Sequence, residues 1–379
     1  MNFVALTMLT GDRSKYFGLV FAIAFSTMLL ENQDSIFAGI LQRTTSQIVD
    51  VTDAPIWVMD PRTEYAEEVK PLNSNALLRV RGVSGVRWAV PLFKGIPRLQ
   101  APDGRFRQAI LMGLDDSTLV GAPRRMLLGS IESLQGPDAI IMDRAGYRFF
   151  YPEGPLELGK VFEMNDRRAK LVGIAEPSAP FATFPVVFSR YSEALRYVGP
   201  ERNLMSFILV KPRDGVAPEE LCRKIERTTR LRAATTEQFA RQTIGYYLRN
   251  TGIPVNFGIT IALAFIVGAV VAGQTFYMFT LDNLRYFGAL KAIGVTDGRL
   301  TGMIVLQALV VAGLGFAIGT GLCAGYFEVT LQKTATRGIV LRLDAIAVTA
   351  CVMAVIVLIA SLLSIRRVLV LEPAAVFRG

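Results

Sequence analysis

Histidine is absent from this chain of 379 residues. Its absence excludes a Ser-His-Asp triad, a histidine general base and histidine-ligated metal sites. The three cysteines are Cys222, Cys323 and Cys351, and the last two lie in apolar runs. They therefore show neither a disulfide framework nor the spacing of zinc ligands. Charged residues make up 19% of the chain and hydrophobic residues 51%, which fits a large soluble protein or a soluble domain carried by membrane helices.

Long apolar runs favour the second alternative. Three segments near the C-terminus, residues 255–281, 301–328 and 343–365, are almost free of charge. Each is long enough to cross a bilayer core of roughly 30 Å as a helix. A buried helix of a soluble protein could explain one such segment. Three in succession predict a membrane protein.

A fourth segment, residues 16–40, is apolar but is interrupted by Glu31 and Asp34. A cleaved signal peptide is the alternative here, because Arg13 and Lys15 precede an apolar stretch of suitable length. No small-residue cleavage site follows it closely. Ionisable residues at membrane depth usually face protein or water. We therefore predict an uncleaved first membrane helix, with both acidic residues near the outer surface.

Orientation follows from the parity of the four helices and from the basic residues in the short segments between them. Basic residues occur in the N-terminal tail 1–15, the loop 282–300 and the tail 366–379, but also in the short loop 329–342. Eight basic residues in the first three segments against three in the fourth is almost a tie per segment, and we place both termini in the cytoplasm with loop 329–342 outside.

The segment between the first and second membrane helices, residues 41–252, is too long for a connection and must be a domain. Its ends, 35–49 and 236–250, are predicted to be helices that form a stalk. Residues 217–229 predict a helix that carries Pro218 in its first turn. Short apolar runs between turn signals predict strands at 55–60, 86–92, 106–112, 139–142, 168–174, 184–188 and 205–211. We expect an α+β extracytoplasmic domain inserted into a bundle of four transmembrane helices.

Residues 154–160, GPLELGK, resemble the start of a phosphate-binding P-loop. Val161 stands where the hydroxyl that binds magnesium is needed, and Pro155 and Glu157 disrupt the anion site. A turn that enters a strand is the better interpretation, and no serine lies in a nucleophile-elbow pattern. We therefore expect a non-enzymatic chain without its own cofactor or metal. The net charge of +9 suits a cytoplasmic membrane face, and no nucleic-acid partner is expected.

Small residues in the membrane helices indicate close helix packing. The third helix contains Gly315 with Gly319, and Gly321 with Gly325, at G-x-x-x-G spacing, and Gly268 lies in the second helix. This spacing lets helix backbones approach closely in lipid. Packing within one chain and packing between two copies are both consistent with it.

The cytoplasmic loop 282–300 contains a short apolar helix. Leu284, Phe287, Leu290 and Ile293 are its main apolar residues, and Gly294 is a natural C-terminal cap. An exposed apolar helix either has a protein partner or lies on lipid.

At this loop the sequence resembles the MacB/FtsX family of ABC-transporter permeases. The resemblance rests on residues 285–294 (RYFGALKAIG), on the glycine-rich third helix and on residues 365–377 near the C-terminus. Residues 29–37 (LLENQDSIF) and 251–254 (TGIP) look most like the DevC-like branch. That branch usually has a glutamate where this chain has Arg285, which affects the expected pairing with an ATPase rather than the fold.

The resemblance implies a permease subunit of the bacterial cytoplasmic membrane that forms a homodimer and docks a separate ABC ATPase, which carries ATP and Mg²⁺. The residues implied in coupling to that ATPase are Leu284, Arg285, Phe287, Gly288, Leu290, Lys291, Ile293 and Gly294.

Three functions are considered. Export of a lipid, peptide or drug-like substrate, with a periplasmic adaptor and outer-membrane channel as in DevC-like systems, is favoured because the insert is long. The alternative is an FtsX-like mechanical signaller that regulates a cell-wall hydrolase. A membrane-anchored enzyme is disfavoured by the lack of histidine and of a nucleophile pattern.

Overall fold

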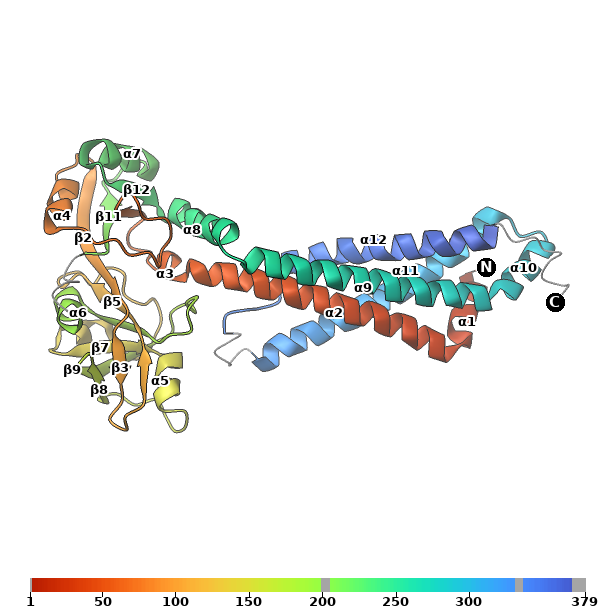
Figure 1. Cartoon of the computed structure of the whole chain (residues 1–379), viewed down its shortest axis with the longest axis horizontal. Helices are drawn as coiled ribbons and strands as arrows, with labels where there is room; N and C mark the ends of the chain where they lie inside the picture. Colours follow the sequence, from red (N-terminus) through yellow and green to blue (C-terminus); the bar gives the residue numbers. More distant parts are fainter. Residues whose placement is uncertain (1, 199–204, 331–336, 370–379) are drawn as a thin grey trace. The chain divides into compact units, whose positions relative to one another are not determined.

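A computed structural model describes residues 2–198, 205–330 and 337–369 of the chain (Figure 1). The chain divides into two compact units, which are described separately. The helix unit comprises Met1–Gly39 and Gly252–Gly379, and the head domain comprises Ile40–Thr251. Residues 331–336 of the predicted loop 329–342, and the part of the C-terminal motif beyond residue 369, lie outside the described residues.

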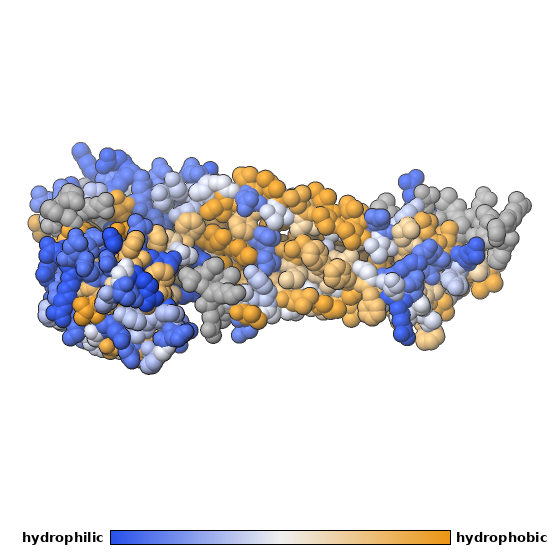
Figure 2. All heavy atoms as spheres, turned by 60° about the horizontal axis from the view of Figure 1, so that its bottom comes forward, coloured by the Kyte–Doolittle hydropathy of each residue, from blue (hydrophilic) through white to orange (hydrophobic). Residues whose placement is uncertain are grey.

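The helix unit contains two short and four long helices among the residues described. The short ones are α1 (Asn2–Gly11) and α10 (Leu284–Ala292). The long ones are α2 (Arg13–Thr44), which continues into the head domain, α9 (Ile253–Asp282), α11 (Asp297–Thr330) and α12 (Leu343–Leu369). All four are long and apolar enough to cross a membrane. Figure 2 shows the band of apolar side chains along them.

The long helices pack around one apolar core. α9 lies against α12, and α12 lies against α11. Ile23 of α2, Phe276 of α9, Ile304 of α11 and Ile356 of α12 are buried in the same cluster. Helices in lipid gain little from the hydrophobic effect, so this close packing is what holds the unit together.

The head domain is built on one mixed sheet of twelve strands, counted over the residues described. In sequence order they are β1 (Ile56–Met59), β2 (Val86–Gly95), β3 (Arg98–Gln100), β4 (Phe106–Gln108), β5 (Ile110–Leu114), β6 (Met126–Gly129), β7 (Ala139–Asp143), β8 (Val161–Met164), β9 (Arg167–Ala175), β10 (Val186–Arg190), β11 (Phe207–Pro212) and β12 (Arg232–Thr235). Across the sheet the order is β12-β1-β11-β2-β5-β10-β7-β9-β8-β3-β4, and β6 pairs with β9.

Strand β2 joins the two halves of this sheet. Its first part pairs with β11, and Phe93–Gly95 pairs with β5. Most neighbours are antiparallel, but β5 with β10 and β7 with β9 are parallel pairs. Because parallel strands need a crossover connection, these pairs require the long excursions of the chain between them.

Helices cover the sheet according to their apolar faces. The helices of the head domain are α3 (Ser46–Val49), α4 (Ser74–Arg81), the 3₁₀ helix η1 (Ile131–Gln135), α5 (Arg144–Phe150), α6 (Tyr191–Tyr197), α7 (Pro218–Thr229) and α8 (Thr236–Asn250). Val80 of α4 and Ile225 of α7 are buried together with Ile208 of β11. Phe239 of α8 is buried in another cluster with Trp57 of β1. The expected α+β domain inserted between the first and second membrane helices is therefore confirmed.

Candidate functional site

Helix α10 is separated from the membrane helices on both sides by well-defined backbone breaks. At its start, the Asn283 carbonyl accepts hydrogen bonds from the backbone N–H groups of Tyr286 and Phe287, at 3.0 and 3.2 Å. At its end, Gly294 has a φ of +92°, the left-handed conformation that glycine adopts without strain. The Val295 N–H donates to the Leu290 carbonyl at 3.1 Å, which closes a Schellman cap.

One face of α10 packs into the helix unit. Phe287 is only 1% exposed, and Gly288 is also buried. Leu284 and Leu290 are half-buried against the same apolar core. These four predicted coupling residues therefore lie on the side of α10 that packs against the helix unit.

The opposite face of α10 is exposed. Ile293 is 78% exposed and Tyr286 is also largely exposed, and Arg285 and Ala289 lie on the same outward side. We call Arg285, Tyr286, Ala289 and Ile293 the outward face of α10. The predicted coupling residues thus include both packed and exposed residues. Tyr286 and Ala289 share the exposed side but were not in the predicted set, because helical period alone does not say which face is buried.

Two lysines make hydrogen bonds and ion pairs around α10. Lys291 Nζ donates to the Leu369 carbonyl at 3.0 Å, near the end of α12, and lies 3.2 Å from Asp297 Oδ1 at the start of α11. Lys15 of α2 pairs with Asp282, the last residue of α9. The Lys291 contacts join α10 to α11 and to the end of α12, and the Lys15–Asp282 pair joins the neighbouring ends of α2 and α9. Together they fix the position of α10 at one end of the helix unit.

Helix α1 lies in the segment that was predicted only as a tail, residues 1–15. Ala5 and Leu9 are buried against the core, and Gln307 of α11 donates to the Ala5 carbonyl at 2.8 Å. Phe3 is 81% exposed on the other side. The signal available in the sequence was the spacing of Ala5 and Leu9, which places them on one helical face.

The predicted packing glycines also divide into two groups. A Cβ on Gly319 would lie 2.5 Å from the Ala24 carbonyl oxygen of α2, and one on Gly315 would lie 2.7 Å from Ile23. Gly268 makes a similarly close approach to Ser26 of α2. These three glycines pack within the chain. Gly321 and Gly325 have no atom within 4 Å of a Cβ position among the described residues, so they remain open for lipid or a second copy.

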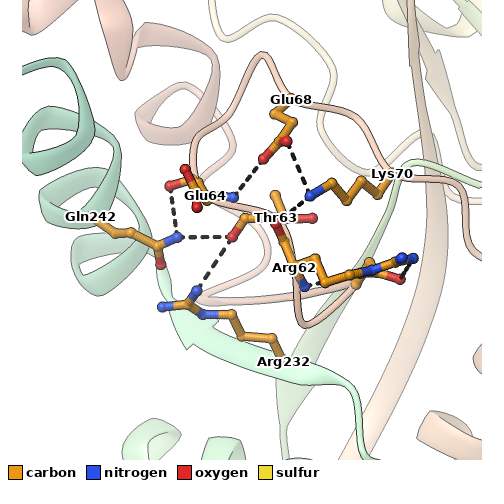
Figure 3. A network of polar contacts seen from close by, with 8 residues as sticks. Arg62, Thr63, Glu64, Glu68, Lys70, Arg232 and Gln242 are labelled. Atoms are coloured by element: carbon orange, nitrogen blue, oxygen red, sulfur yellow. Dashed lines mark hydrogen bonds and ion pairs between the residues drawn. The ribbon is translucent and has the colours of Figure 1, made fainter. Parts of the chain in front are cut away.

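In the head domain, residues 60–70 form a loop that we call the strap. It begins with a turn in which Asp60 accepts a hydrogen bond from the Thr63 N–H at 3.0 Å, with Pro61 at a position that proline favours. Within it, Lys70 Nζ lies 3.0 Å from Glu68 Oε1, and Glu68 Oε2 accepts from the Glu64 N–H at 2.9 Å (Figure 3).

The strap is bonded to α8 and to β12. Gln242 of α8 donates from Nε2 to the carbonyls of Thr63 and Glu64, at 3.0 and 2.7 Å (Figure 3). Arg232 of β12 also donates to the Thr63 carbonyl, at 3.3 Å. Tyr65 stacks on Tyr246 of α8 with ring centroids 4.1 Å apart. The strap therefore fixes α8 to the sheet at several points.

Two titratable groups of the head domain lie beneath the strap. Lys94 of β2 is buried, and its Nζ donates to the Ala66 carbonyl at 3.0 Å. Burial lowers the pKa of Lys94 to about 8, and the Glu67 carboxylate opposes this shift. The Tyr247 hydroxyl donates to Glu67 Oε2 at 2.6 Å. Burial, and then the hydrogen bond to Glu67, raise the pKa of Tyr247.

The loop that resembled a P-loop leads into β8, as predicted. Gly154 and Gly159 have φ values of +85° and +82°, and Lys160 Nζ lies 2.7 Å from Glu157 Oε2. The lysine is thus paired within its own loop. Over the residues with described positions, no group of three histidine, cysteine, aspartate or glutamate side chains could hold a metal ion.

A bundle of four membrane-spanning helices, interrupted after the first by a periplasmic-type α+β domain, defines a multi-pass membrane protein with a one-plus-three arrangement. The family model described as the MacB-like periplasmic core domain matches residues 16–228, and that described as the FtsX-like permease C-terminal matches residues 258–373. The first match alone covers more than half of the chain. The protein belongs to the MacB/FtsX family of ABC transporter permeases.

Sequence relatives are also described as ABC transporter permeases. The chain is 28% identical over 225 residues to an uncharacterized ABC transporter permease of Mycobacterium bovis, covering 59% of this chain and 58% of the relative. It is 28% identical over 228 residues, with the same coverage, to another from Mycobacterium tuberculosis. Each alignment thus spans less than two thirds of the relative's length. The periplasmic region of MacB from Actinobacillus actinomycetemcomitans matches with a TM-score of 0.39 and 15% identity, covering 54% of this chain and 96% of that one.

Proposed function

We propose that this chain is the non-catalytic permease subunit of a bacterial ABC exporter in the cytoplasmic membrane. Both termini and α10 lie in the cytoplasm, a separate ATPase that holds ATP and Mg²⁺ docks on α10, and two copies of the chain form the transporter. The cargo is a lipid, a peptide or a drug-like molecule. A periplasmic adaptor and an outer-membrane channel complete the system, as in the DevC-like branch.

The observation that carries this proposal is the outward face of α10. Ile293 and Tyr286 are exposed apolar and aromatic groups, whereas Phe287 on the other side is fully buried. Lys291 holds this helix to α11 and to the end of α12. A helix that is held in place and exposes large side chains is suited to bind a partner and to be displaced by it, because aromatic and apolar anchors dominate binding energy at interfaces.

The covalent order of the chain supplies a path from α10 to the head domain. α9 precedes α10, and α8 precedes α9 with only Thr251 and Gly252 between them. A displacement of α10 is passed along α9 to α8, and the strap passes it from α8 to the sheet. The work is done on the head domain, outside the membrane, in this proposal.

The FtsX-like signaller remains the alternative function. It shares the same membrane helices and the same coupling through α10. The match of residues 16–228 to the MacB-like periplasmic core domain supports export, because this part of the chain is where the two alternatives differ.

The test uses the full chain reconstituted in lipid nanodiscs with a candidate partner ABC ATPase from the same organism. Ile293→Asp places a charge on the outward face of α10. We expect ATPase binding to weaken about tenfold or more, as for the loss of an interface anchor. Leu290→Asp is a poorer test, since Leu290 is half-buried and its substitution disturbs the fold.

The control is Val329→Asp at the far end of α11. Val329 is 78% exposed, as Ile293 is, so the two substitutions differ in place rather than in burial. ATPase binding and activity should be unchanged in the control. Equal binding of the ATPase to the Ile293→Asp variant and to the unaltered chain would exclude docking on this face.

A further inference from the structure

The helix unit contains a buried carboxyl group that the coupling path does not use. Glu31 of α2 is 0% exposed. Thr320 of α11 donates from Oγ1 to Glu31 Oε1 at 2.7 Å. The second oxygen, Glu31 Oε2, has no hydrogen-bond partner among the residues that the structure describes. An ionisable group inside a membrane segment is costly and usually marks a functional site.

Two hydroxyl groups continue this polar site along α2. Thr27 and Ser35 lie four residues before and after Glu31, so all three share one face of the helix. Both residues are fully buried, and their hydroxyl oxygens likewise lack a partner in the described part of the chain. Thr27 packs against α11, because a Cβ on Gly319 would lie 2.7 Å from its Cβ. The polar line therefore follows the seam between α2 and α11.

The neighbouring groups on α2 and α11 do not neutralise Glu31. The Cys323 thiol of α11 lies within electrostatic range of it. Asp34, one turn further along α2, is acidic as well. Glu328, the acidic residue in the second half of α11, is exposed.

The remaining helices bring no countercharge to this seam either. Arg342 pairs with Asp344 at 2.8 Å, at the start of α12, and both lie within electrostatic range of Asp34. Residues 345–365 of α12 and residues 253–281 of α9 contain no charged side chain. A buried carboxylate that meets no countercharge among the described residues is neutralised by a proton or by a bound cation.

The chemistry of the seam favours the proton. Metal cations such as Ca²⁺ need six or more oxygen ligands, and transporters supply the carbonyls for Na⁺ by unwinding a helix. Here α2 and α11 are unbroken helices over Arg13–Thr44 and Asp297–Thr330, so their carbonyls are engaged within the helices. A proton needs only one carboxylate oxygen, and Glu31 Oε2 is the oxygen without a partner among the described residues.

We propose that Glu31 is a proton-binding site that links protonation to the pairing of α2 with α11. The carboxyl group is neutral when the two helices pack as described, with the proton on Oε2. Ionisation in place is costly without water, so loss of the proton favours separation of the helices at this level. This site is independent of the docking of an ATPase on α10.

Infrared spectroscopy of the full chain at about pH 7, in a detergent without carbonyl groups such as an alkyl maltoside, tests the proposal, because ordinary carboxyl groups are ionised at that pH. We expect a carbonyl stretch of a protonated carboxyl group in the unaltered chain. The band should be lost in Glu31→Gln and kept in Glu328→Gln, the exposed control on α11. Absence of the band from the unaltered chain, or its persistence in Glu31→Gln, overturns the proposal. The first of these results needs no variant, so poor folding of Glu31→Gln does not remove the test.

Thermal unfolding distinguishes the proton from a metal cation. Between about pH 6 and about pH 9, the unfolding midpoint of the unaltered chain should fall by about 2–4 °C relative to that of Glu31→Gln. This fall should be the same in sodium chloride and in choline chloride. A midpoint that rises with sodium in the unaltered chain, but not in Glu31→Gln, identifies a metal-cation site and overturns the assignment to a proton.

Discussion

The hydroxyl group of Tyr247 on α8 donates a 2.6 Å hydrogen bond to the carboxylate of Glu67 in the strap, although the two residues are 180 positions apart. Because the acceptor is charged, this bond is worth about 1.5–3 kcal/mol. Tyr247→Phe removes the bond and leaves the ring in place. We expect it to lower the free energy of unfolding by that amount and to speed hydrogen exchange in residues 60–70.

The control for Tyr247→Phe is the same substitution at Tyr286, which is largely exposed on α10. Denaturant unfolding of the full chain in detergent measures the free energy, and mass spectrometry locates the exchange. If exchange in the strap is as slow in Tyr247→Phe as in the Tyr286→Phe control, the hydrogen bond does not hold the strap to α8.

The second prediction concerns the pH dependence of stability that Lys94 causes. Its pKa is lowered to about 8 in the folded protein, from a model-compound value of 10.5. Below the folded value, the charged lysine is buried at a cost. Between pH 8 and 10.5 the folded chain has released this proton while the unfolded chain keeps it, so stability rises with pH. The rise attributable to Lys94 is roughly 3 kcal/mol.

Lys94→Met isolates this contribution, because all other titrating groups are common to both chains. The variant also loses the hydrogen bond to the Ala66 carbonyl, so the slopes against pH are compared rather than the absolute free energies. We expect the slope in alkaline solution to be smaller in the variant. Parallel curves for the two chains would show that Lys94 is not desolvated in the folded protein.

The third prediction separates the two groups of glycines on α11. Gly319→Ala forces a methyl group against the Ala24 carbonyl, whereas Gly321→Ala points into open space. Overpacking of this kind costs about 1–3 kcal/mol, so only Gly319→Ala should lower the thermal unfolding midpoint. The two substitutions change the same helix two positions apart, and each serves as the other's control. Equal unfolding midpoints for the two variants would mean that α2 and α11 can move apart at this contact at little cost in free energy.

The long apolar runs predicted the membrane helices because length and hydropathy are local properties of the sequence. The helix over 217–229 and the strands over 55–60 and 139–142 were predicted from equally local signals, and they are confirmed as α7, β1 and β7. Helix α1 was missed because ten residues are too few to span a bilayer, and its burial depends on contacts with α11. The coupling role of α10 stays a prediction.

Contacts between distant parts of the chain could not be read from the sequence. The parallel pairing of β10 with β5 joins Val186 to Ile110, and nothing local in either strand specifies that partner. The strap has the composition of an ordinary polar loop. Its attachment to α8 depends on Gln242, almost 180 positions away. Likewise Glu31 was predicted to lie near the outer surface, and its burial against Thr320 becomes visible only in the folded helix unit.

The position of β12 has a consequence for how the head domain bears load. β12 has four residues, lies at the edge of the sheet and leads directly into the capping box that starts α8 at Thr235. A force applied to the sheet through α8 alone would act on the short row of hydrogen bonds between β12 and β1. It could break these bonds one after another. The strap attaches α8 to the sheet at further points, so the β12–β1 bonds and the strap contacts must break together. The domain can then move as a rigid body under a pull that would otherwise unzip its edge.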